Sequence, residues 1–283
     1  MLTTLATVLM MALTTLQSAM LSLAQPEAEP EAPIRTADDL LLALEREGEG
    51  IRTLRAGIRY QREFAVAGDI QTRTGTLYYR SAPSDEGGPD SRAFAVNFDT
   101  MQVGGVLHRD REMVYIFDGS WVVEKHPRER QFIKRRVVPE GQAFDPLRLG
   151  EGPFPIPIGQ KRDDIVERFE ATLAPVEEGL WDEALVDFAS RSTTFQLRLI
   201  PRAAFARELE LTEVRIWYEQ SSEGPLRLLP RMAWTKTADE DESIVQLINV
   251  RFNEPLPEGV IDTEPPGAGW DVDIRDDFAE RRR

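Results

Sequence analysis

The sequence predicts an α+β protein that is mainly β, with about nine to eleven strands in one antiparallel sheet and two or three helices. From Leu54 onward, apolar and polar residues alternate in stretch after stretch, which is the pattern of half-buried strands. Turn signals such as Asp118-Gly119 and Gly224-Pro225 separate these stretches. Short turns make neighbouring strands pair antiparallel, and a sheet with this many strands must curl, close or split.

The N-terminal 24 residues carry no charged side chain and include an apolar core from Leu5 to Leu16. Ser22-Leu23-Ala24 ends in the small-x-small pattern of a leader-peptidase site, so we expect residues 1–24 to be a signal peptide. An uncleaved membrane anchor is the alternative.

Composition divides the rest of the chain into three parts. Residues 25–35 are rich in Pro and Glu and predict a disordered spacer. Residues 36–274 carry the periodic patterns and predict the folded domain, and residues 275–283 predict a charged C-terminal tail.

The composition excludes several classes of function. The net charge is −15, so there is no basic surplus to neutralise the phosphates of nucleic acid or to hold the chain on an anionic lipid surface. The chain has no cysteine, so it forms no disulfide and has no thiolate chemistry.

A helix is expected over residues 36–48. Thr36 and Asp39 predict a variant of the capping box at its start, with an acidic first turn. Leu40, Leu41 and Leu44 then lie on one face, which the residues alone describe as an ordinary core-facing helix.

The strands follow in order. They are expected at 54–64, 74–80, 92–99, 113–117, 121–126, 131–138, 195–200, 211–219, 227–237 and 243–253, with a return to strand at 170–176. Residues 81–91 have the composition of a loop, residues 161–169 predict a helix, and residues 177–192 leave a short helix open. Prolines alternate with apolar residues over 153–158, which predicts an extended loop over a surface or an opening.

The hairpin at 113–126 is the centre of the pattern. An Asp-Gly pair between β-branched and aromatic residues predicts a tight turn with positive φ at its centre. Both faces of the incoming strand carry apolar side chains, so both faces must be covered. One cover is protein, and the other is either protein or an apolar ligand.

Catalytic chemistry has little support. His108 and His126 are the only histidines, and neither has nearby acidic residues at the spacing of a metal site. No Gly-x-Ser-x-Gly motif is present. We therefore expect no catalytic residue, no metal and no cofactor, and a protein that is not an enzyme.

Laid out in this order, the chain resembles the LolA-type lipoprotein carriers and related unclosed β-barrel lipid carriers. Four stretches carry the resemblance and are spread over most of residues 36–273: Gly75-Thr76-Leu77-Tyr78-Tyr79, Asp118-Gly119-Ser120-Trp121-Val122-Val123, Leu197-Arg198-Leu199-Ile200-Pro201-Arg202 and Pro265-Pro266-Gly267-Ala268-Gly269-Trp270-Asp271-Val272. The resemblance implies an incomplete antiparallel barrel, with helices as a lid and an apolar space for acyl chains. An arginine helps to hold the lid in that family, and Arg80 or Arg92 could match it.

The resemblance gives a set of candidate residues for such a cavity. They are apolar side chains on the expected helices and strands: Leu40, Leu44, Ile58, Tyr60, Phe64, Phe94, Val96, Phe98, Ile116, Trp121, Ile165, Phe169, Trp217 and Trp234. Without the resemblance, the aromatic residues among them are more simply explained as plain core.

The leading hypothesis is a periplasmic carrier that binds lipid or the acyl chains of lipoproteins and transfers them between membranes. The resemblance implies transfer partners at the inner and outer membranes. An envelope sensor or scaffold that uses the same fold to bind a partner protein is the alternative. A lipid hydrolase would need a convergent polar cluster inside the cavity, and no residue spacing predicts one.

Overall fold

The computed structural model describes residues 33–48, 50–82, 91–138, 149, 161–221 and 228–276. The chain divides into two units, Met1–Pro33 and Ile34–Arg283, and the fold below is that of the second. The expected signal peptide, the Pro-rich 153–158 loop, and most of the spacer and C-terminal tail lie outside the described residues. No helix of the described part has both the length and the apolar character needed to span a membrane.

The described residues form four helices and thirteen strands. The helices are α1 (Ala37–Gly48), α2 (Arg162–Arg168), α3 (Glu183–Ser192) and α4 (Ala206–Leu209). The strands are β1 (Thr53–Phe64), β2 (Asp69–Ala82), β3 (Ser91–Val103), β4 (Val106–His108), β5 (Met113–Phe117), β6 (Trp121–His126), β7 (Gln131–Arg136), β8 (Phe169–Ala174), β9 (Phe195–Pro201), β10 (Leu211–Gln220), β11 (Leu228–Thr237), β12 (Glu242–Phe252) and β13 (Asp271–Arg275).

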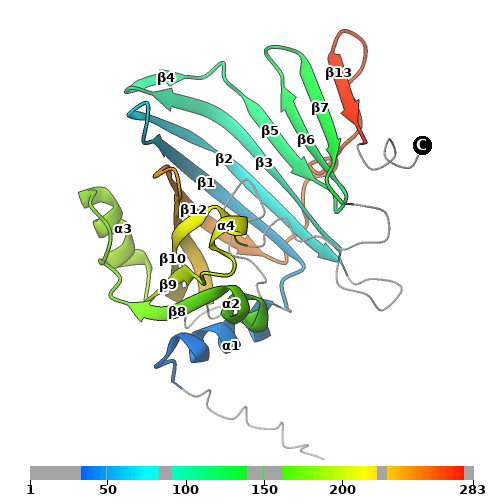
Figure 1. The fold of residues 1–283 in the computed structure, drawn as a ribbon. Coiled ribbons are helices and arrows are strands. Elements are labelled where there is room, and N and C mark those ends of the chain that lie inside the picture. The colour runs from blue at the N-terminus through cyan, green and yellow to red at the C-terminus, as the bar shows by residue number, and fades with distance from the viewer. Residues whose placement is uncertain are drawn as a thin grey trace, which may run out of the picture. The chain divides into compact units, whose positions relative to one another are not determined.

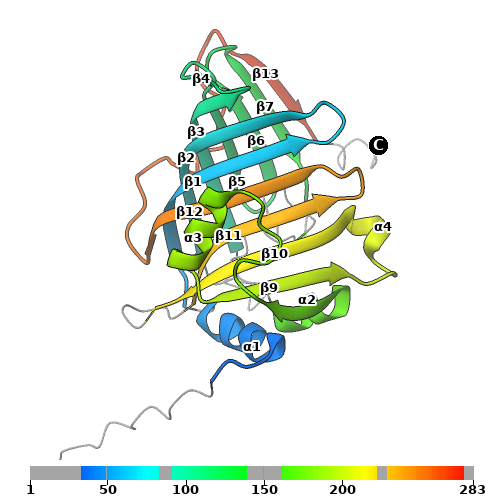
Figure 2. The same ribbon diagram turned by 90° about the vertical axis from the view of Figure 1, so that its left-hand side faces the viewer.

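All the strands belong to one sheet, in the order β13-β7-β6-β5-β3-β2-β1-β12-β11-β10-β9-β8, with β4 paired to β3 (Figures 1 and 2). Every pairing is antiparallel except that of β13 with β7. The order has two ends, β13 and β8, so the sheet is an incomplete barrel as expected. The expected count of nine to eleven strands was too low. The three residues of β4 are too few to show alternation, and β13 pairs with a strand far away in the sequence.

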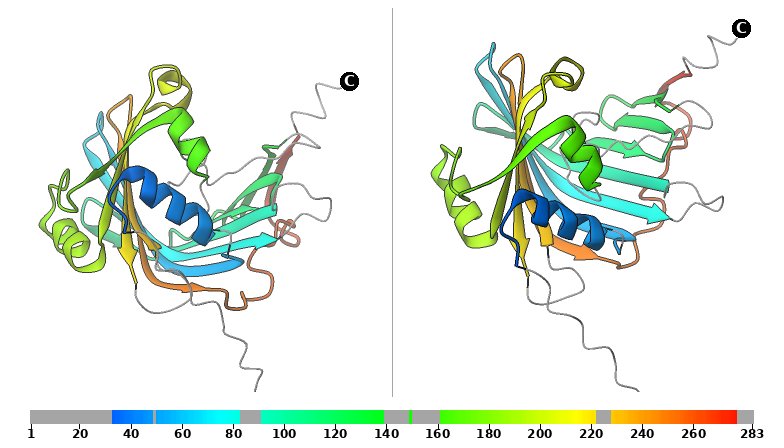
Figure 3. Two further views of the ribbon diagram at one scale, coloured as in Figure 1. Left: turned by 90° about the horizontal axis from the view of Figure 1, so that it is seen from below. Right: turned by 60° about the horizontal axis from the view of Figure 1, so that its bottom comes forward.

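The sheet is curled, and its two faces are covered by different parts of the chain. Figure 3 shows α1 and α2 inside the curl, against the concave face, and α3 outside it. Residues that follow β12 cross the convex face, where Leu256, Val260 and Trp270 pack against the sheet. This arrangement is the incomplete barrel with helices on its concave face that is expected from the sequence.

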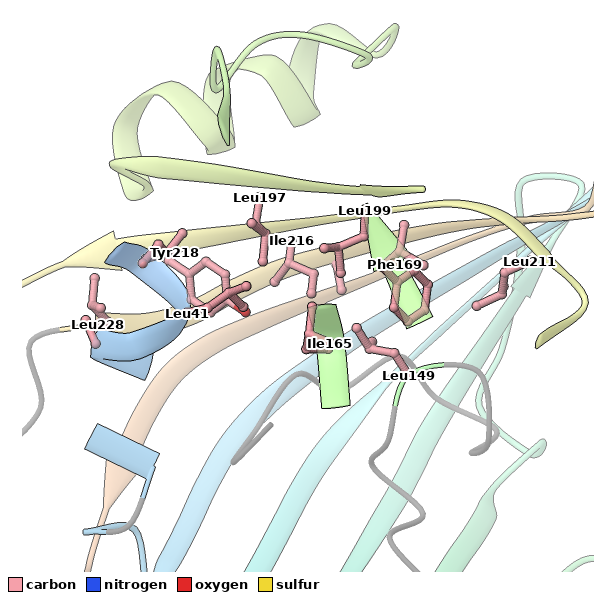
Figure 4. Close-up of a cluster of buried hydrophobic side chains, with 14 of the residues drawn as sticks. Leu41, Leu149, Ile165, Phe169, Leu197, Leu199, Leu211, Ile216, Tyr218 and Leu228 are labelled. Atoms are coloured by element: carbon pink, nitrogen blue, oxygen red, sulfur yellow. The ribbon is translucent and has the colours of Figure 1, made fainter. Parts of the chain in front are cut away.

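Two apolar clusters line the concave face. The first lies on the long central strands and contains Ile51, Leu54, Ala56, Ile58, Leu77, Tyr79, Phe94, Val96, Phe98, Phe117, Val138, Val245 and Leu247. The second lies beneath α1 and α2, and Figure 4 shows ten of its members labelled: Leu41, Leu149, Ile165, Phe169, Leu197, Leu199, Leu211, Ile216, Tyr218 and Leu228. We call them the central cluster and the lid cluster.

The convex face carries two further clusters. Leu185 and Ala189 of α3 pack on Trp217, Met232 and Trp234. Across the sheet, the residues after β12 pack on Tyr78, Ala95, Ile116, Val123 and Phe132. The apolar character of both faces of the 113–126 hairpin is thereby explained: protein covers its convex face, and its concave face belongs to the central cluster.

The hairpin itself is as expected, but the centre of its turn is shifted by one residue. Phe117 is opposite Val122, and the Asp118 N–H donates to the Trp121 carbonyl at 3.3 Å, so the two central residues are Gly119 and Ser120. Gly119 has φ +109°, while Asp118 does not have positive φ. Instead, the Asp118 Oδ1 accepts hydrogen bonds from the backbone N–H of Ser120 (2.9 Å) and Trp121 (2.8 Å). The carboxylate therefore fixes an Asx-type turn.

A polar network on β9 and β10 holds the chain before α3. Gln196, fully buried, donates to the carbonyls of Pro175 and Glu178, and Trp217 Nε1 donates to the Val176 carbonyl at 2.7 Å. Arg215 donates to Gln196 Oε1 at 2.8 Å. Trp217 points to the convex face because its indole N–H has a partner there.

The expected capping box opens α1. The Asp39 N–H donates to Thr36 Oγ1 (3.1 Å), and Asp39 Oδ2 accepts from the backbone N–H groups of Arg35 (3.0 Å) and Thr36 (2.9 Å). These hydrogen bonds lower the pKa of Asp39 below its ordinary value of 3.8.

This lowering predicts how the cap responds to pH. A carboxyl whose folded-state pKa is depressed stabilises the native state above its unfolded pKa, and the stabilisation is lost as the pH falls through the folded-state pKa. We expect an NMR titration of the Asp39 carboxyl to give a pKa below the ordinary 3.8, and Thr36→Ala to raise it. An unchanged pKa in Thr36→Ala would contradict the capping role.

Candidate functional site

The part of the concave face covered by α1 and α2 is closed by a small number of contacts. Leu40 and Leu41 of α1 are buried in the lid cluster, with exposed fractions of 0% and 3%. Asp38 Oδ1 accepts from Arg162 Nε of α2 at 2.7 Å, and Glu47 Oε2 accepts from the backbone N–H of Leu228 at 2.7 Å. Two polar ties and an apolar face therefore hold α1 in place.

Helix α2 covers the neighbouring strands in the same way. Ile165 and Phe169 are buried among Leu197 and Leu199 of β9 (Figure 4). The buried Arg168 donates from Nη1 to the Leu149 carbonyl at 3.1 Å. Leu149 itself, 1% exposed, fills space between the helix and the sheet.

Little empty space remains among the described residues beneath the helices. A cavity of about 30 Å³ lies among residues of α1, α2 and strands β9–β11, including Leu41, Ile165, Ile216 and Tyr218. That is about the room of one water molecule, whereas pockets for small molecules measure roughly 300–1,000 Å³. Among the described residues the lid cluster is therefore closely packed, and an acyl chain enters the space between them only if a helix or side chain moves.

Beyond the helices the concave face holds larger pockets. One of about 210 Å³ is lined by Tyr60, Arg62, Phe64, Gln71, Arg73, Met113 and Tyr115. Burial, with the nearby Glu124 carboxylate, raises the pKa of Tyr115 to about 12, so this phenol is uncharged at neutral pH. The pocket adjoins the central cluster, because Tyr60, Met113 and Tyr115 pack against that cluster.

A second pocket of about 390 Å³ shares Arg73 and Met113 with the first. Its other lining residues are Met101, Val103, His108, Arg111, Glu112, His126 and Glu129, so both histidines of the chain meet here. The described residues nevertheless contain no group of three or more His, Cys, Asp or Glu side chains placed to hold a metal ion.

The structure brings ten of the fourteen candidate residues to the concave face. Leu40, Leu44, Ile165 and Phe169 belong to or pack against the lid cluster, and Ile58, Tyr60, Phe94, Val96 and Phe98 belong to or pack against the central cluster. Phe64 lines the 210 Å³ pocket.

The other four candidates lie on the convex face. Ile116 packs in the cluster under the residues after β12, and Trp217 and Trp234 pack under α3. Trp121 shares the face of Val123, two residues further along β6, and lies against Lys134. The structure thus separates these four side chains from the concave face.

The arginine paired with α1 in the structure is Arg162 of α2, whose position in the sequence offered no signal of this pairing. Two other arginines, Arg80 and Arg92, could match the family's lid-holding residue. Arg80 is exposed, and it shares the convex face with Tyr78, two residues earlier on β2. Arg92 is opposite Ser81 at the end of β3.

Several residues of the concave face were missed although alternation could have found them. Val214, Ile216 and Tyr218 share one face of β10, and that face is the concave one, so their neighbour Trp217 lies on the other. In β5, Met113, Tyr115 and Phe117 share the concave face, and their neighbour Ile116 lies on the convex face. Following these alternating faces from strand to strand would have placed Ile116 and Trp217 opposite the concave residues.

No family model and no curated protein matches this sequence. Solved structures do match in fold. An uncharacterized conserved protein from Thermus thermophilus aligns with a TM-score of 0.42 at 10% identity, over 84% of this chain and 99% of its own. A putative outer membrane lipoprotein-sorting protein domain from Vibrio parahaemolyticus gives 0.40 at 12% identity, over 80% and 95%. A LolA superfamily protein from Nitrosomonas europaea gives 0.33 at 11%, over 81% and 98%. At these identities and TM-scores the likeness says nothing about ligand or activity.

Proposed function

We propose that the protein binds lipid, or the acyl chains of lipoproteins, on the concave face of its sheet and carries them between membranes of the cell envelope without catalysis. One observation carries the proposal. The concave face joins two apolar clusters, of which one is covered by helices held by two polar ties and the other borders open pockets.

The energetics explain why a carrier would cover its ligand. Each methylene moved from water to an apolar surface contributes about 0.8 kcal/mol, so a chain of about fourteen carbons resists exposure by roughly 10 kcal/mol. To cross an aqueous compartment, the chain needs an enclosing apolar surface whose binding free energy is comparable to this cost of exposure. Much tighter binding would prevent release.

The close packing of the described residues beneath the helices suggests a role for α1. Since the cavity among these residues measures about 30 Å³, α1 must lift for a chain to reach the lid cluster. Lifting α1 breaks the Asp38–Arg162 and Glu47–Leu228 ties and exposes Leu40 and Leu41. The packed arrangement is then the closed form of the carrier.

The direct test is the ligand itself. Lipid extraction and native mass spectrometry of the protein purified from envelope fractions should show bound lipid, and unlabelled fatty acid should displace a fluorescent fatty acid. Absence of both bound lipid and probe binding would reject the proposal.

Weakening the lid should speed ligand entry. Asp38→Asn removes the ion pair to Arg162, and because exposed pairs stabilise only weakly we expect the association rate of a fluorescent fatty acid to rise about two- to fivefold in stopped-flow measurements. Asp187→Asn is the matched control, because it breaks the exposed Asp187–Arg191 pair on α3, on the convex face. Equal rates in the two variants would show that α1 does not gate entry.

A second function, a sensor or scaffold that binds a partner protein, is favoured by one observation. The described residues beneath the helices enclose a cavity of only about 30 Å³, as expected of a folded platform that holds no cargo. Its test is co-purification of one stoichiometric partner together with absence of extractable lipid.

A further inference from the structure

The 210 Å³ pocket has an unusual charge for this protein. The chain contains 49 acidic and 34 basic residues, yet the described residues lining this pocket include two arginines and no carboxylate. The remaining lining residues are Tyr60, Phe64, Gln71, Met113 and Tyr115. An anionic group placed here would meet two guanidinium groups and three aromatic side chains, while the carboxylates of Glu124 and Asp241 are hydrogen-bonded to Tyr115 and Arg62.

The two arginines differ in what they contact. Arg62 is already paired, with its Nη2 3.0 Å from Asp241 Oδ2. Arg73 forms no ion pair with any described carboxylate; its Nη1 donates to the Arg111 carbonyl at 3.3 Å. Burial lowers the pKa of Arg73, and the like charge of Arg111 acts in the same direction. A half-buried guanidinium without an anion has charge-assisted hydrogen bonds still to offer.

Arg73 also stands at the border of the apolar surface. It lies opposite Tyr60 of β1 and Met101 of β3, and its Cζ is 5.9 Å from the ring centroid of Phe98, a member of the central cluster. The next residue on this face of β2 is Gly75, which has no side chain to separate Arg73 from that cluster. A ligand whose charged group binds Arg73 would therefore have the rest of its structure next to the central cluster.

We propose that Arg73 binds the anionic head group, a carboxylate or phosphate, of an acylated amphiphile whose chain lies along the central cluster. The inference rests on the proposed function and names its ligand class. The head group lies in the 210 Å³ pocket at Arg73, and the chain extends over Tyr60, Met113 and Tyr115, which pack against the central cluster. Phe98, Val96 and Ile58 of that cluster are 1%, 0% and 2% exposed, so the chain reaches them only when the residues that cover them move. Arg73 is thus a binding residue that orients the ligand.

The test compares ligands that share an oleyl chain. Displacement of a fluorescent fatty acid is measured for oleate, 1-oleoyl lysophosphatidic acid and oleyl alcohol, with inorganic phosphate as the chain-free anion. We expect the full-length protein to prefer both anions over the alcohol by about 10- to 100-fold, as a charge-assisted hydrogen bond predicts. Arg73→Gln should abolish this preference and leave alcohol binding unchanged, while Arg73→Lys should retain part of it.

Arg128→Gln is the matched control. It removes a positive charge from the turn that carries Glu129, but Arg128 lines neither pocket and pairs with Asp110. Its head-group preference should equal that of the parent protein. Equal affinity for oleate and oleyl alcohol in the parent, or equal losses in Arg73→Gln and Arg128→Gln, would overturn the inference while leaving lipid binding intact. Competition by inorganic phosphate alone would also overturn it, since the site would then be an anion site without a chain. Binding of none of the amphiphiles would instead reject the proposed function.

Discussion

Replacing Gly75 by alanine is expected to destabilise the protein by about 3 kcal/mol or more. A Cβ at this position would lie 1.9 Å from the Asn97 carbonyl oxygen and 2.8 Å from the Phe98 Cα, both backbone atoms of β3. The pairing of β2 with β3 has a register shift between Thr74 and Gly75, where the strands approach closely. The side chain cannot be accommodated unless β3 moves, and β3 carries Phe98 in the middle of the central cluster.

Urea unfolding followed by circular dichroism measures this effect. Gly57→Ala on the neighbouring β1 is the matched control, because its Cβ would meet the Ile248 carbonyl oxygen at 3.4 Å and the Ile248 Cβ at 3.7 Å, which are ordinary contacts. Its free energy of unfolding should change by no more than about 1 kcal/mol. If both variants unfolded at the same urea concentration, the close approach at Gly75 would not be real.

Replacing Leu41 by alanine should cost about 2–5 kcal/mol in the absence of ligand, and bound fatty acid should restore part of the loss. Leu41 is 3% exposed and lines the cavity of about 30 Å³, so its truncation enlarges the space that an acyl chain would occupy. A ligand that binds only the native state adds stability by mass action, about 2.7 kcal/mol at a concentration of 100 times its Kd. Ligand should therefore raise the stability of the variant more than that of the parent protein, whose cavity must first open.

Leu185→Ala on α3 separates this effect from a general response to ligand. Leu185 is 4% exposed and packs on the convex face. The Leu185→Ala variant should therefore lose a similar amount of stability, while the stability it gains from ligand should equal that of the parent protein. Thermal unfolding of the three proteins with and without a saturating fatty acid gives the comparison. Equal gains in all three would mean that ligand does not enter the lid cluster, which favours the scaffold alternative.

How far the sequence predicts this protein is clearest from particular elements. The alternation from Leu54 to Phe64 and the Asp118-Gly119 signal are local, and the structure has β1 and the β5–β6 hairpin there. The capping box of Thr36 and Asp39 is local too, and its hydrogen bonds are present. By contrast, β13 pairs with β7 across about 140 residues of sequence, and no local pattern encodes such a partner.

The candidate site shows the same contrast between local patterns and the arrangement of distant parts of the chain. Alternation tells which residues share a face, but it does not tell which face is concave, because both faces of this sheet are apolar and covered. Trp217 and Trp234 are cavity candidates in the sequence because they are aromatic residues on expected strands, whereas α3 and the Trp217–Val176 hydrogen bond place them on the convex face. Arg73 has no sequence signal of its own. Its importance comes from the absence of a carboxylate partner among the described residues, which only the arrangement of neighbouring strands reveals.

Among the described strands the sheet has two ends, which give it a mechanical property that a closed barrel lacks. In a closed barrel, strand number and stagger fix the radius, so the interior volume cannot change without breaking hydrogen bonds between strands. Here the order ends at β13 and β8, and each neighbouring pair of strands between them has its own twist. Small changes in twist, summed over the eleven pairings along this order, widen or narrow the curl while every inter-strand hydrogen bond is kept. The volume enclosed by the curl can therefore change by bending of a continuous sheet.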